Sequence, residues 1–220
     1  MNTMITAHSG SDGTPDNSME YVRHALSCGA DAFEIDVRAN AAGEFYLSHD
    51  WSEDEGPGLH RVFALLKDSP MSLNCDLKEE GLERKLLALA EESGVLDRII
   101  LSGSVSPACV AENPQVRAHT YLNLEMVFPA ALERYQRQEV PTAEEIWAAA
   151  RACRKCGAEI INVYYPVCTE ENLEIFRESG VGVSAWTVNE ETEALRLLKR
   201  GIANITTRRP KLVQSLRSAL

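Results

Sequence analysis

The feature of this sequence that most constrains its fold is a regular alternation of short β-rich segments with helical patterns. Nine segments read as strands because they are rich in β-branched and aromatic residues. They lie at 4–7, 32–37, 44–49, 71–77, 98–102, 116–122, 159–164, 180–188 and 204–207. The clearest helical patterns lie at 17–29, 81–94, 142–157, 169–180 and 189–201. Strands that alternate with single helices are typical of βαβ units around a parallel sheet.

Capping signals support these helices. Several begin at Asn or Thr with Glu about three residues later, as Thr142 and Glu145 do, and several end at a glycine such as Gly157. A helix leaves unpaired N–H groups at its start and unpaired carbonyl groups at its end, which such residues satisfy. The predicted ends therefore agree with the predicted periodicity.

Roughly eight such units predict a parallel sheet that closes into a (β/α)8 barrel. No low-complexity tract or long linker divides the chain, so we expect one domain over residues 1–220. An open, doubly wound sheet is the alternative. That fold usually carries G-x-G-x-x-G after its first strand, and the sequence AHSGSDG at 7–13 does not have this spacing.

The charge balance narrows the class of partner. The chain has a net charge of −11, with 22 basic and 33 acidic residues. A protein that binds nucleic acid or an anionic membrane surface needs a basic face, so we expect neither partner. A small anionic substrate held through a metal ion remains compatible with this charge. Residues 1–8 lack a basic leader, and no apolar run approaches the ~18 residues that span a bilayer. These observations predict a cytoplasmic protein without a stable membrane anchor.

The six cysteines are scattered through predicted helices and strands rather than spaced as a disulfide framework. We expect them to be reduced. Cys153 and Cys156 form a C-x-x-C pair, but it lies inside the helical pattern 142–157 and has no second pair to complete a zinc site. A packing role is therefore expected for both.

Two predicted strands carry acidic residues on a face that should be apolar. Strands of a parallel barrel are buried on both faces and normally read as continuous apolar runs. In AFEIDV, Glu34 and Asp36 share one face, because side chains alternate along a strand. In LNCDLK, Asn74, Asp76 and Lys78 share one face in the same way.

Three carboxylates in a barrel interior must be compensated, because an isolated buried charge is strongly disfavoured. A divalent cation such as Mg²⁺ or Ca²⁺, which prefers carboxylate oxygens, is one hypothesis. A structural cluster of ion pairs is the other, and it consists of Glu34, Asp36, Arg38 and Lys78.

Two histidines end predicted strands, His8 after the first strand and His49 after the segment 44–49. A single histidine in such a place is more often structural. Together with three carboxylates, however, they gather at the carboxyl ends of barrel strands, which is where barrels of this kind build their active sites.

These residues resemble the glycerophosphodiester phosphodiesterase family. The family pattern is an apolar strand ending in His-Arg-Gly, a Pro-Glu-Asn-Thr loop, a helix, Gly-Ala-Asp, Glu-x-Asp-Val and a later His-Asp. The segment 5–50 follows this order, LNCDLK at 73–78 is similar to the family's Asn-x-Glu-x-Lys, and AWTVN at 185–189 also matches. ITTRRP at 205–210 weakly resembles the ending Ile-x-Thr-Asn-Arg-Pro.

The resemblance implies a (β/α)8 barrel that hydrolyses glycerophosphodiesters to glycerol 3-phosphate and an alcohol. It places acid/base histidines at His8 and His49. It implies one divalent cation, Mg²⁺ or Ca²⁺, with its ligands at the three carboxylates Glu34, Asp36 and Asp76. Contacts to the substrate fall on Lys78 beside the phosphate, on the pocket aromatic residue Trp186 and on Ser9.

The chain departs from the family pattern at several positions. Ser9 stands where the family has arginine, Asp76 where it has glutamate, and Arg208 where it has asparagine. A serine hydroxyl cannot reproduce the bidentate clamp of an arginine on phosphate. The segment 51–71 is too short for the insertion that many relatives carry after His-Asp.

Two other functions remain open on these grounds. The chain could bind a phosphodiester or glycerol phosphate with weak or no turnover, which the serine at position 9 suggests. Alternatively, it could be a phosphodiesterase with a different substrate.

Overall fold

The computed structural model describes residues 3–52 and 55–220, which form one α/β domain. Its strands are β1 Met4–Ala7, β2 Ala32–Ala39, β3 Phe45–Leu47, β4 Ser72–Leu77, β5 Ile99–Gly103, β6 Tyr121–Asn123, β7 Ile160–Tyr164, β8 Gly182–Trp186 and β9 Asn204–Thr207. Its longer helices are α1 Met19–Ala25, α2 Leu59–Leu66, α3 Glu83–Glu92, α8 Ala143–Cys156, α9 Glu170–Glu178, α10 Glu191–Arg200 and α11 Pro210–Ser218. The shorter helices are α4 Pro107–Glu112, α5 Pro114–His119, α6 Leu124–Val127 and α7 Ala131–Arg137.

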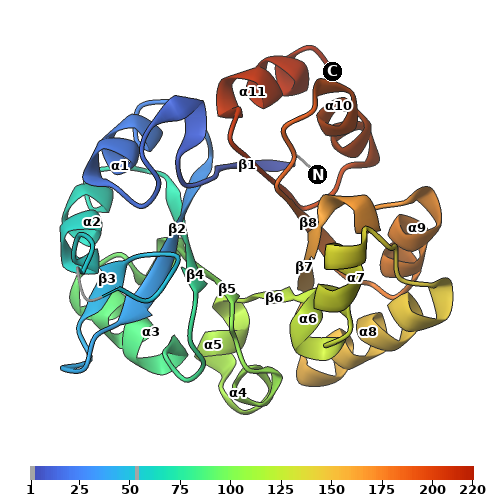
Figure 1. Ribbon diagram of the computed structural model, residues 1–220, viewed down its shortest axis with the longest axis horizontal. Helices are drawn as coiled ribbons and strands as arrows, with labels where there is room; N and C mark the ends of the chain where they lie inside the picture. The colour runs from blue at the N-terminus through green and yellow to red at the C-terminus, as the bar shows by residue number, and fades with distance from the viewer. Residues whose placement is uncertain (1–2, 53–54) are drawn as a thin grey trace.

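Eight parallel strands form a near-closed barrel inside a ring of helices (Figure 1). Their order around the barrel is β5-β4-β2-β1-β9-β8-β7-β6. The seam between β5 and β6 is closed by a single parallel bridge, from Leu101 to Thr120. The predicted (β/α)8 barrel is therefore confirmed, and the alternative open sheet is wrong.

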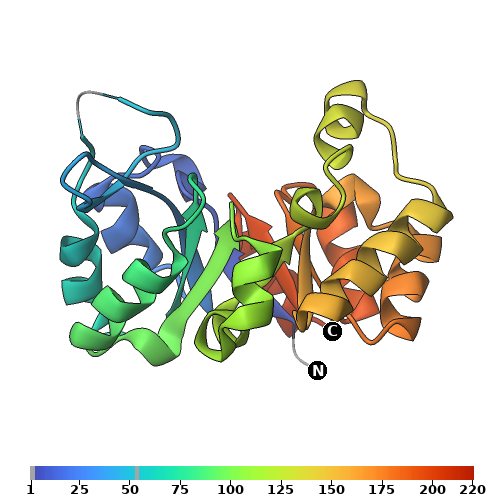
Figure 2. The same cartoon turned by 90° about the horizontal axis from the view of Figure 1, so that it is seen from below.

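The strand predicted at 44–49 forms β3 and lies outside the barrel. β3 pairs antiparallel with the end of β2, with Val37 opposite Leu47. Between β3 and β4 the described residues form a loop and helix α2, as the short segment led us to expect. Helix α7 stands above the barrel in the side view (Figure 2).

One predicted strand is wrong in part. Residues 116–122 were expected to be extended, but α5 runs to His119 and β6 begins only at Tyr121. The cause is local, because the Asn113 side chain accepts hydrogen bonds from Gln115 N and Val116 N and Pro114 occupies the first helical turn. Both residues favour a helix start.

The capping signals fold as predicted in the longest helix. Thr142 and Glu145 form a reciprocal capping box at the start of α8, and Gly157 ends the helix with a φ of 87°. Cys153 and Cys156 are buried on α8, consistent with the packing role expected for them.

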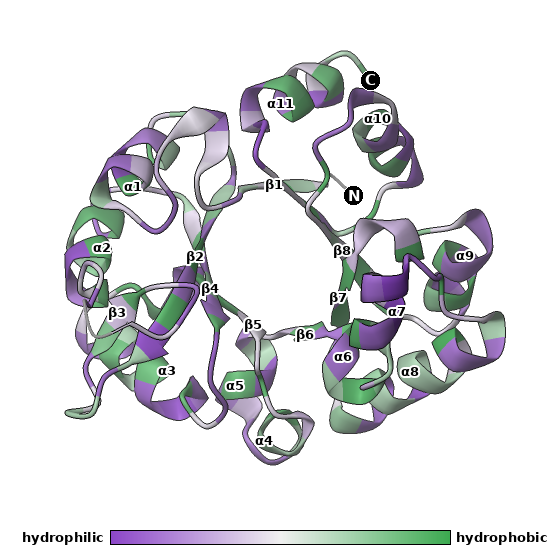
Figure 3. Ribbon diagram, in the orientation of Figure 1, coloured by the Kyte–Doolittle hydropathy of each residue, from purple (hydrophilic) through white to green (hydrophobic). Residues whose placement is uncertain are grey.

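The hydrophobic core fills the space between barrel and helices. The faces of β2 and β4 that carry Ile35, Val37, Cys75 and Leu77 are buried in it. The helices show both hydrophilic and hydrophobic residues in Figure 3, as amphipathic helices on a barrel should. None of the helices in residues 3–52 and 55–220 is long and apolar enough to cross a membrane.

Candidate active site

A cavity of about 770 Å³ opens at the carboxyl ends of the barrel strands. Seven of the eight predicted site residues line it. They are His8, Glu34, Asp36, His49, Asp76, Lys78 and Trp186. This is the end of the barrel at which parallel α/β barrels carry their chemistry.

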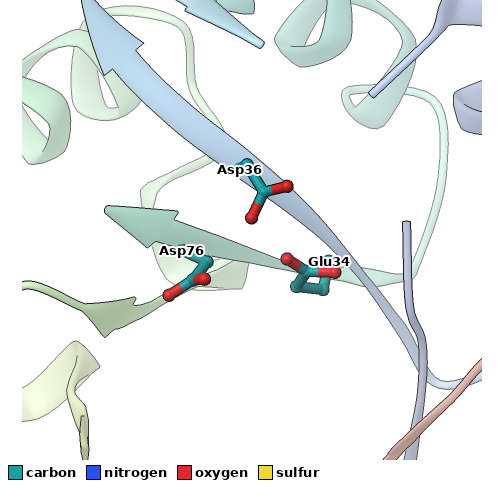
Figure 4. Close-up of side chains that lie close together, drawn as sticks. All are labelled: Glu34, Asp36 and Asp76. Atoms are coloured by element: carbon teal, nitrogen blue, oxygen red, sulfur yellow. The ribbon is translucent and has the colours of Figure 1, made fainter. Parts of the chain in front are cut away.

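Three carboxylates meet on the β2–β4 side of this cavity (Figure 4). The parallel register places Asp36 of β2 beside Asp76 of β4, and Glu34 lies one inward-facing position earlier on β2. One oxygen from each carboxylate lies within 4.8 Å of the others. Glu34 and Asp36 line the cavity although they are only 5% and 6% exposed, whereas Ile35 and Val37 belong to the hydrophobic core, so the predicted alternation is confirmed.

Lys78 compensates part of this charge. Its Nζ lies 2.7 Å from Asp36 Oδ1 and 2.5 Å from Asp76 Oδ2. Arg38 does not join the cluster, because its guanidinium pairs with Glu79 and donates to the carbonyl of His49. The hypothesis of a structural ion-pair cluster is therefore right for Lys78 and wrong for Arg38.

One ammonium group does not balance three carboxylates, and the acid–base equilibria show this. Burial and the nearby charges of Asp36 and Asp76 raise the pKa of Glu34 well above its usual value. Burial would also raise the pKa of Asp36, but Lys78 and the Asn17 amide outweigh it and hold that pKa below its usual value. The two carboxylates raise the pKa of Lys78 despite its burial. Lys78 thus remains charged while Glu34 binds a proton readily.

His8 lies beside the acidic group. Its Nδ1 is 2.7 Å from the carbonyl oxygen of Ser9 and 3.9 Å from Glu34 Oε2. A carbonyl only accepts, so Nδ1 carries the proton in this arrangement and Nε2 is the free acceptor. Burial lowers the pKa of His8, with a further lowering from the charge of Arg208. A neutral ring with a free nitrogen is suited to accept a proton.

His49 is more accessible, with 69% of its side chain exposed at the cavity edge. Its Nδ1 lies 2.9 Å from Asp50 Oδ1. Its backbone is fixed by Arg38, which donates to the His49 carbonyl from two nitrogens.

Ser9, the eighth predicted site residue, is buried and is not among the residues that line the cavity. Its hydroxyl accepts from Asn17 N at 2.7 Å and lies 3.2 Å from Asn17 Oδ1. Its backbone N–H donates to Glu34 Oε2 at 2.9 Å. Asn17 in turn donates from Nδ2 to Asp36 Oδ2 at 2.6 Å and accepts from Asp36 N at 3.0 Å. Ser9 and Asn17 therefore orient two of the three carboxylates.

Asn17 is a functional residue that the sequence reasoning missed. The helix pattern was expected to begin at Asn17, but Ser18 is the residue whose side chain caps α1. Asn17 lies one residue earlier, with a φ of 50°, and its side chain turns inward. The sequence did carry a signal for this residue: residues 15–18, Pro-Asp-Asn-Ser, match the family's Pro-Glu-Asn-Thr loop, and Asn17 is its asparagine.

Amide side chains and Trp186 form the opposite side of the cavity. Asn162 Nδ2 donates to Asn123 Oδ1 at 2.9 Å, and Asn123 Nδ2 donates to Glu125 Oε1 at 2.8 Å. Burial raises the pKa of Glu125. Tyr121, which the sequence grouped with Asn123 and Glu125, instead directs its hydroxyl to the Met4 sulfur.

The acidic group fits a hard divalent cation. Carboxylate oxygens are the ligands that Mg²⁺ and Ca²⁺ prefer. The buried Oδ1 of Asn74, which also lines the cavity, has no hydrogen-bond partner among the described residues. Across the described chain, the group of His, Cys, Asp and Glu side chains close enough to hold an ion is Glu34, Asp36 and Asp76.

Comparisons with known proteins show which sequences and folds this chain is similar to. No family model matches the chain. A glycerophosphodiester phosphodiesterase of Caldanaerobacter subterraneus subsp. tengcongensis is 24% identical over 98% of this chain and 98% of its own length. The crystal structure of a glycerophosphodiester phosphodiesterase from Parabacteroides distasonis has a TM-score of 0.75 at 15% identity, covering 99% of this chain and 98% of that one.

A phosphodiesterase from Oleispira antarctica has been solved in complex with the product sn-glycerol-3-phosphate. It is 19% identical, with a TM-score of 0.68, and the match covers 99% of this chain and 97% of that one. The structural matches share the fold, and the sequence match extends the likeness over nearly the whole chain.

Proposed function

Because the chain belongs to the glycerophosphodiester phosphodiesterase family, we propose that it hydrolyses glycerophosphodiesters to glycerol 3-phosphate and an alcohol. The observation that carries the proposal is the position of His8 beside three convergent carboxylates in one cavity. The product complex of the Oleispira antarctica relative supports the same class of substrate.

Glu34, Asp36 and Asp76 would hold one divalent cation, Mg²⁺ or Ca²⁺. Such a cation withdraws charge from a non-bridging phosphate oxygen and holds the phosphate in place. Ser9 and Asn17 keep the Glu34 and Asp36 carboxylates in position for this task. Lys78 forms ion pairs with both Asp36 and Asp76 and so reduces the repulsion between these two carboxylates.

The two histidines carry out the proton transfers of the reaction. His8 Nε2 accepts the proton of the glycerol hydroxyl next to the phosphate, and that oxygen forms a bond to phosphorus. The bond from phosphorus to the alcohol oxygen breaks, and His49 donates a proton to the departing alkoxide. Water then opens the cyclic phosphate with the two proton transfers reversed. Each positioned transfer contributes typically ~10² to 10⁴ in rate.

The test is to incubate the purified protein with glycerophosphocholine, glycerophosphoethanolamine and bis-p-nitrophenyl phosphate. Each substrate is tried with Mg²⁺, Ca²⁺ or Mn²⁺, and products are identified by ³¹P NMR. We expect metal-dependent release of glycerol 3-phosphate and its loss in His8→Ala. His60→Ala is the matched control, because His60 is exposed on α2 and outside the cavity.

Equal turnover by the wild type and His8→Ala would contradict the assignment of the base. Tight binding of glycerol 3-phosphate without turnover under any metal would instead identify a binding protein. Turnover of bis-p-nitrophenyl phosphate alone would indicate a phosphodiesterase with a different substrate.

A further inference from the structure

The cavity holds three carboxylates, yet its proposed substrate is an anion, so a cationic side chain with free donors is needed. In the described part of the chain, the lysine and arginine side chains that line the cavity are those of Lys78 and Arg208. Lys78 is already committed to Asp36 and Asp76, at 2.7 and 2.5 Å. Arg208 is the remaining candidate.

Arg208 follows β9, and its backbone is fixed on both sides. Its N–H donates to Asn189 Oδ1 at 2.9 Å, and its carbonyl accepts from Asp12 N at 2.9 Å. Its guanidinium Nη2 lies 2.9 Å from Asp16 Oδ1, with 41% of the side chain exposed. A guanidinium has five N–H donors, so one contact with Asp16 leaves most of them free.

The guanidinium lies against the backbone turn that directly follows Ser9. Gly10 has a φ of 74°, and a Cβ atom there would lie 2.6 Å from Arg208 Nη1 and would also meet Asp16 Oδ1. A side chain at position 10 would therefore displace the ends of the Asp16 and Arg208 side chains from where they lie, and the positive φ also favours glycine there. The charge of Arg208 also reaches His8, whose pKa it helps to lower.

We propose that Arg208 binds the substrate phosphate, with its guanidinium reaching the turn after β1 from the end of β9. The inference deepens the proposed function and rests on it for the identity of the substrate. Ser9 and Arg208 stand at positions where the family pattern has arginine and asparagine, so this chain lacks a positive charge after β1 and carries one after β9, in the cavity that His8 also lines. Ser9 is thereby free to orient the Asn17 amide.

The chemistry of the side chain suits this role. A planar guanidinium presents paired N–H groups that match two phosphate oxygens, which an ammonium cannot do. Asp16 is 55% exposed and holds the guanidinium at the cavity rim. The phosphate would engage the donors that Asp16 leaves unused.

The experiment is calorimetric titration of the Mg²⁺-loaded full chain with glycerol 3-phosphate and, separately, with inorganic phosphate. We expect Arg208→Ala to weaken both by about 10- to 100-fold, since hydrogen bonds to a charged group are being removed. Arg208→Lys should recover part of the loss, because it restores charge but not the paired geometry. Arg209→Ala is the matched control, since Arg209 is exposed and outside the cavity.

Urea unfolding of each variant confirms that it is folded before binding is compared. Unchanged affinity of Arg208→Ala for both ligands would overturn the proposal, as would an equal loss in Arg209→Ala. If the wild type binds both ligands through Arg208 but turns over no glycerophosphodiester, the proposed function fails while this inference stands. If turnover occurs and KM is the same in Arg208→Ala, the inference fails while the function stands.

Discussion

Two walls of the same cavity satisfy their polar groups in opposite ways. The charged wall consists of His8, Glu34, Asp36, Asp76 and Lys78, from the ends of β1, β2 and β4. The amide wall consists of Asn123, Glu125, Asn162 and Trp186, from the ends of β6, β7 and β8.

In the amide wall, the two asparagines and Glu125 form a chain of hydrogen bonds, with Gly103 N donating to Asn123 Oδ1 at 3.1 Å. In the charged wall, every carboxylate has a partner, yet three acids face one ammonium group. The excess charge is costly in a buried site unless a further cation is bound. The comparison therefore separates a wall whose excess negative charge calls for a cation from a wall linked by amide hydrogen bonds, in which Glu125 Oε2 and Trp186 Nε1 have no hydrogen-bond partner among the described residues.

The largest effect is expected from Glu34→Gln, which removes one carboxylate from the charged wall. Loss of a residue that merely supports a metal ligand typically costs 10- to 100-fold in affinity, so loss of a ligand should cost at least about 100-fold. Titration calorimetry with Mg²⁺ measures the change, and metal-dependent turnover should fall with it. Mg²⁺ affinity within the error of the wild type would show that the three carboxylates form a structural cluster with Lys78.

A smaller effect is expected from Asn17→Ala, which frees both Asp36 Oδ2 and Asp36 N from their partner. We expect Mg²⁺ affinity to fall about 10-fold and the free energy of unfolding to fall by about 1–3 kcal/mol. Asn40→Ala is the control, because Asn40 bonds Glu44 and Glu55 outside the cavity. Equal Mg²⁺ affinities for the two variants would show that Asn17 does not contribute to metal binding.

The charged wall should also make stability depend on pH. The pKa of Glu34 is raised on folding, so the folded state holds more protons than the unfolded chain above the usual value of 4.5. The free energy of unfolding should therefore fall as pH rises from that value through the raised pKa of Glu34. Asp36 acts in the opposite direction, because its lowered pKa gives stability above 3.8 that is lost in acid.

Urea midpoints measured in EDTA between about pH 4 and 8 would resolve the Glu34 contribution. Glu34→Gln should flatten the fall, and Mg²⁺ should flatten it in the wild type because the cation competes with the proton. A wild-type slope that persists in Glu34→Gln would assign the effect to another group.

The smallest effect on Mg²⁺ affinity is expected when a glutamate of the amide wall, Glu125, is replaced by glutamine. Glu125→Gln keeps the oxygen that accepts from Asn123, and burial already raises the pKa of this carboxyl. Mg²⁺ affinity should change by no more than about two-fold, which corresponds to the ~0.5 kcal/mol of a tolerated substitution. A loss as large as that of Glu34→Gln would mean that the two walls share the ion.

Local signals in the sequence were enough to predict the barrel and the charged wall. Alternation along AFEIDV and LNCDLK placed Glu34, Asp36 and Asp76 on the inward face, and the parallel register of β2 and β4 brought them together. The start of α8 was also predictable from local sequence, because the capping box of Thr142 and Glu145 involves residues only three positions apart.

Contacts between distant segments were not predictable in this way. Ser9 was expected to contact the substrate at the position of the family's arginine, whereas its hydroxyl bonds Asn17 after the loop turns back. In the sequence, Arg208 was only a departure from the family's C-terminal pattern Ile-x-Thr-Asn-Arg-Pro. Its ion pair with Asp16, which is distant in the sequence, forms only in the folded chain. Residues 116–119 were read as strand because β-rich composition was given more weight than the Asn-Pro helix start.

The seam between β5 and β6 has a consequence for how the molecule moves. β1 and β9 share a ladder from Met4 to Ala7, whereas β5 and β6 meet through one bridge and the bond from Gly103 to the Asn123 side chain. Segments with few ladder bonds open first in the native state, so amide protons here should exchange with solvent sooner than those of β1. Because Ser102 and Asn123 also line the cavity, we expect opening of this seam to widen the cavity while the β1–β9 ladder on the opposite side stays paired.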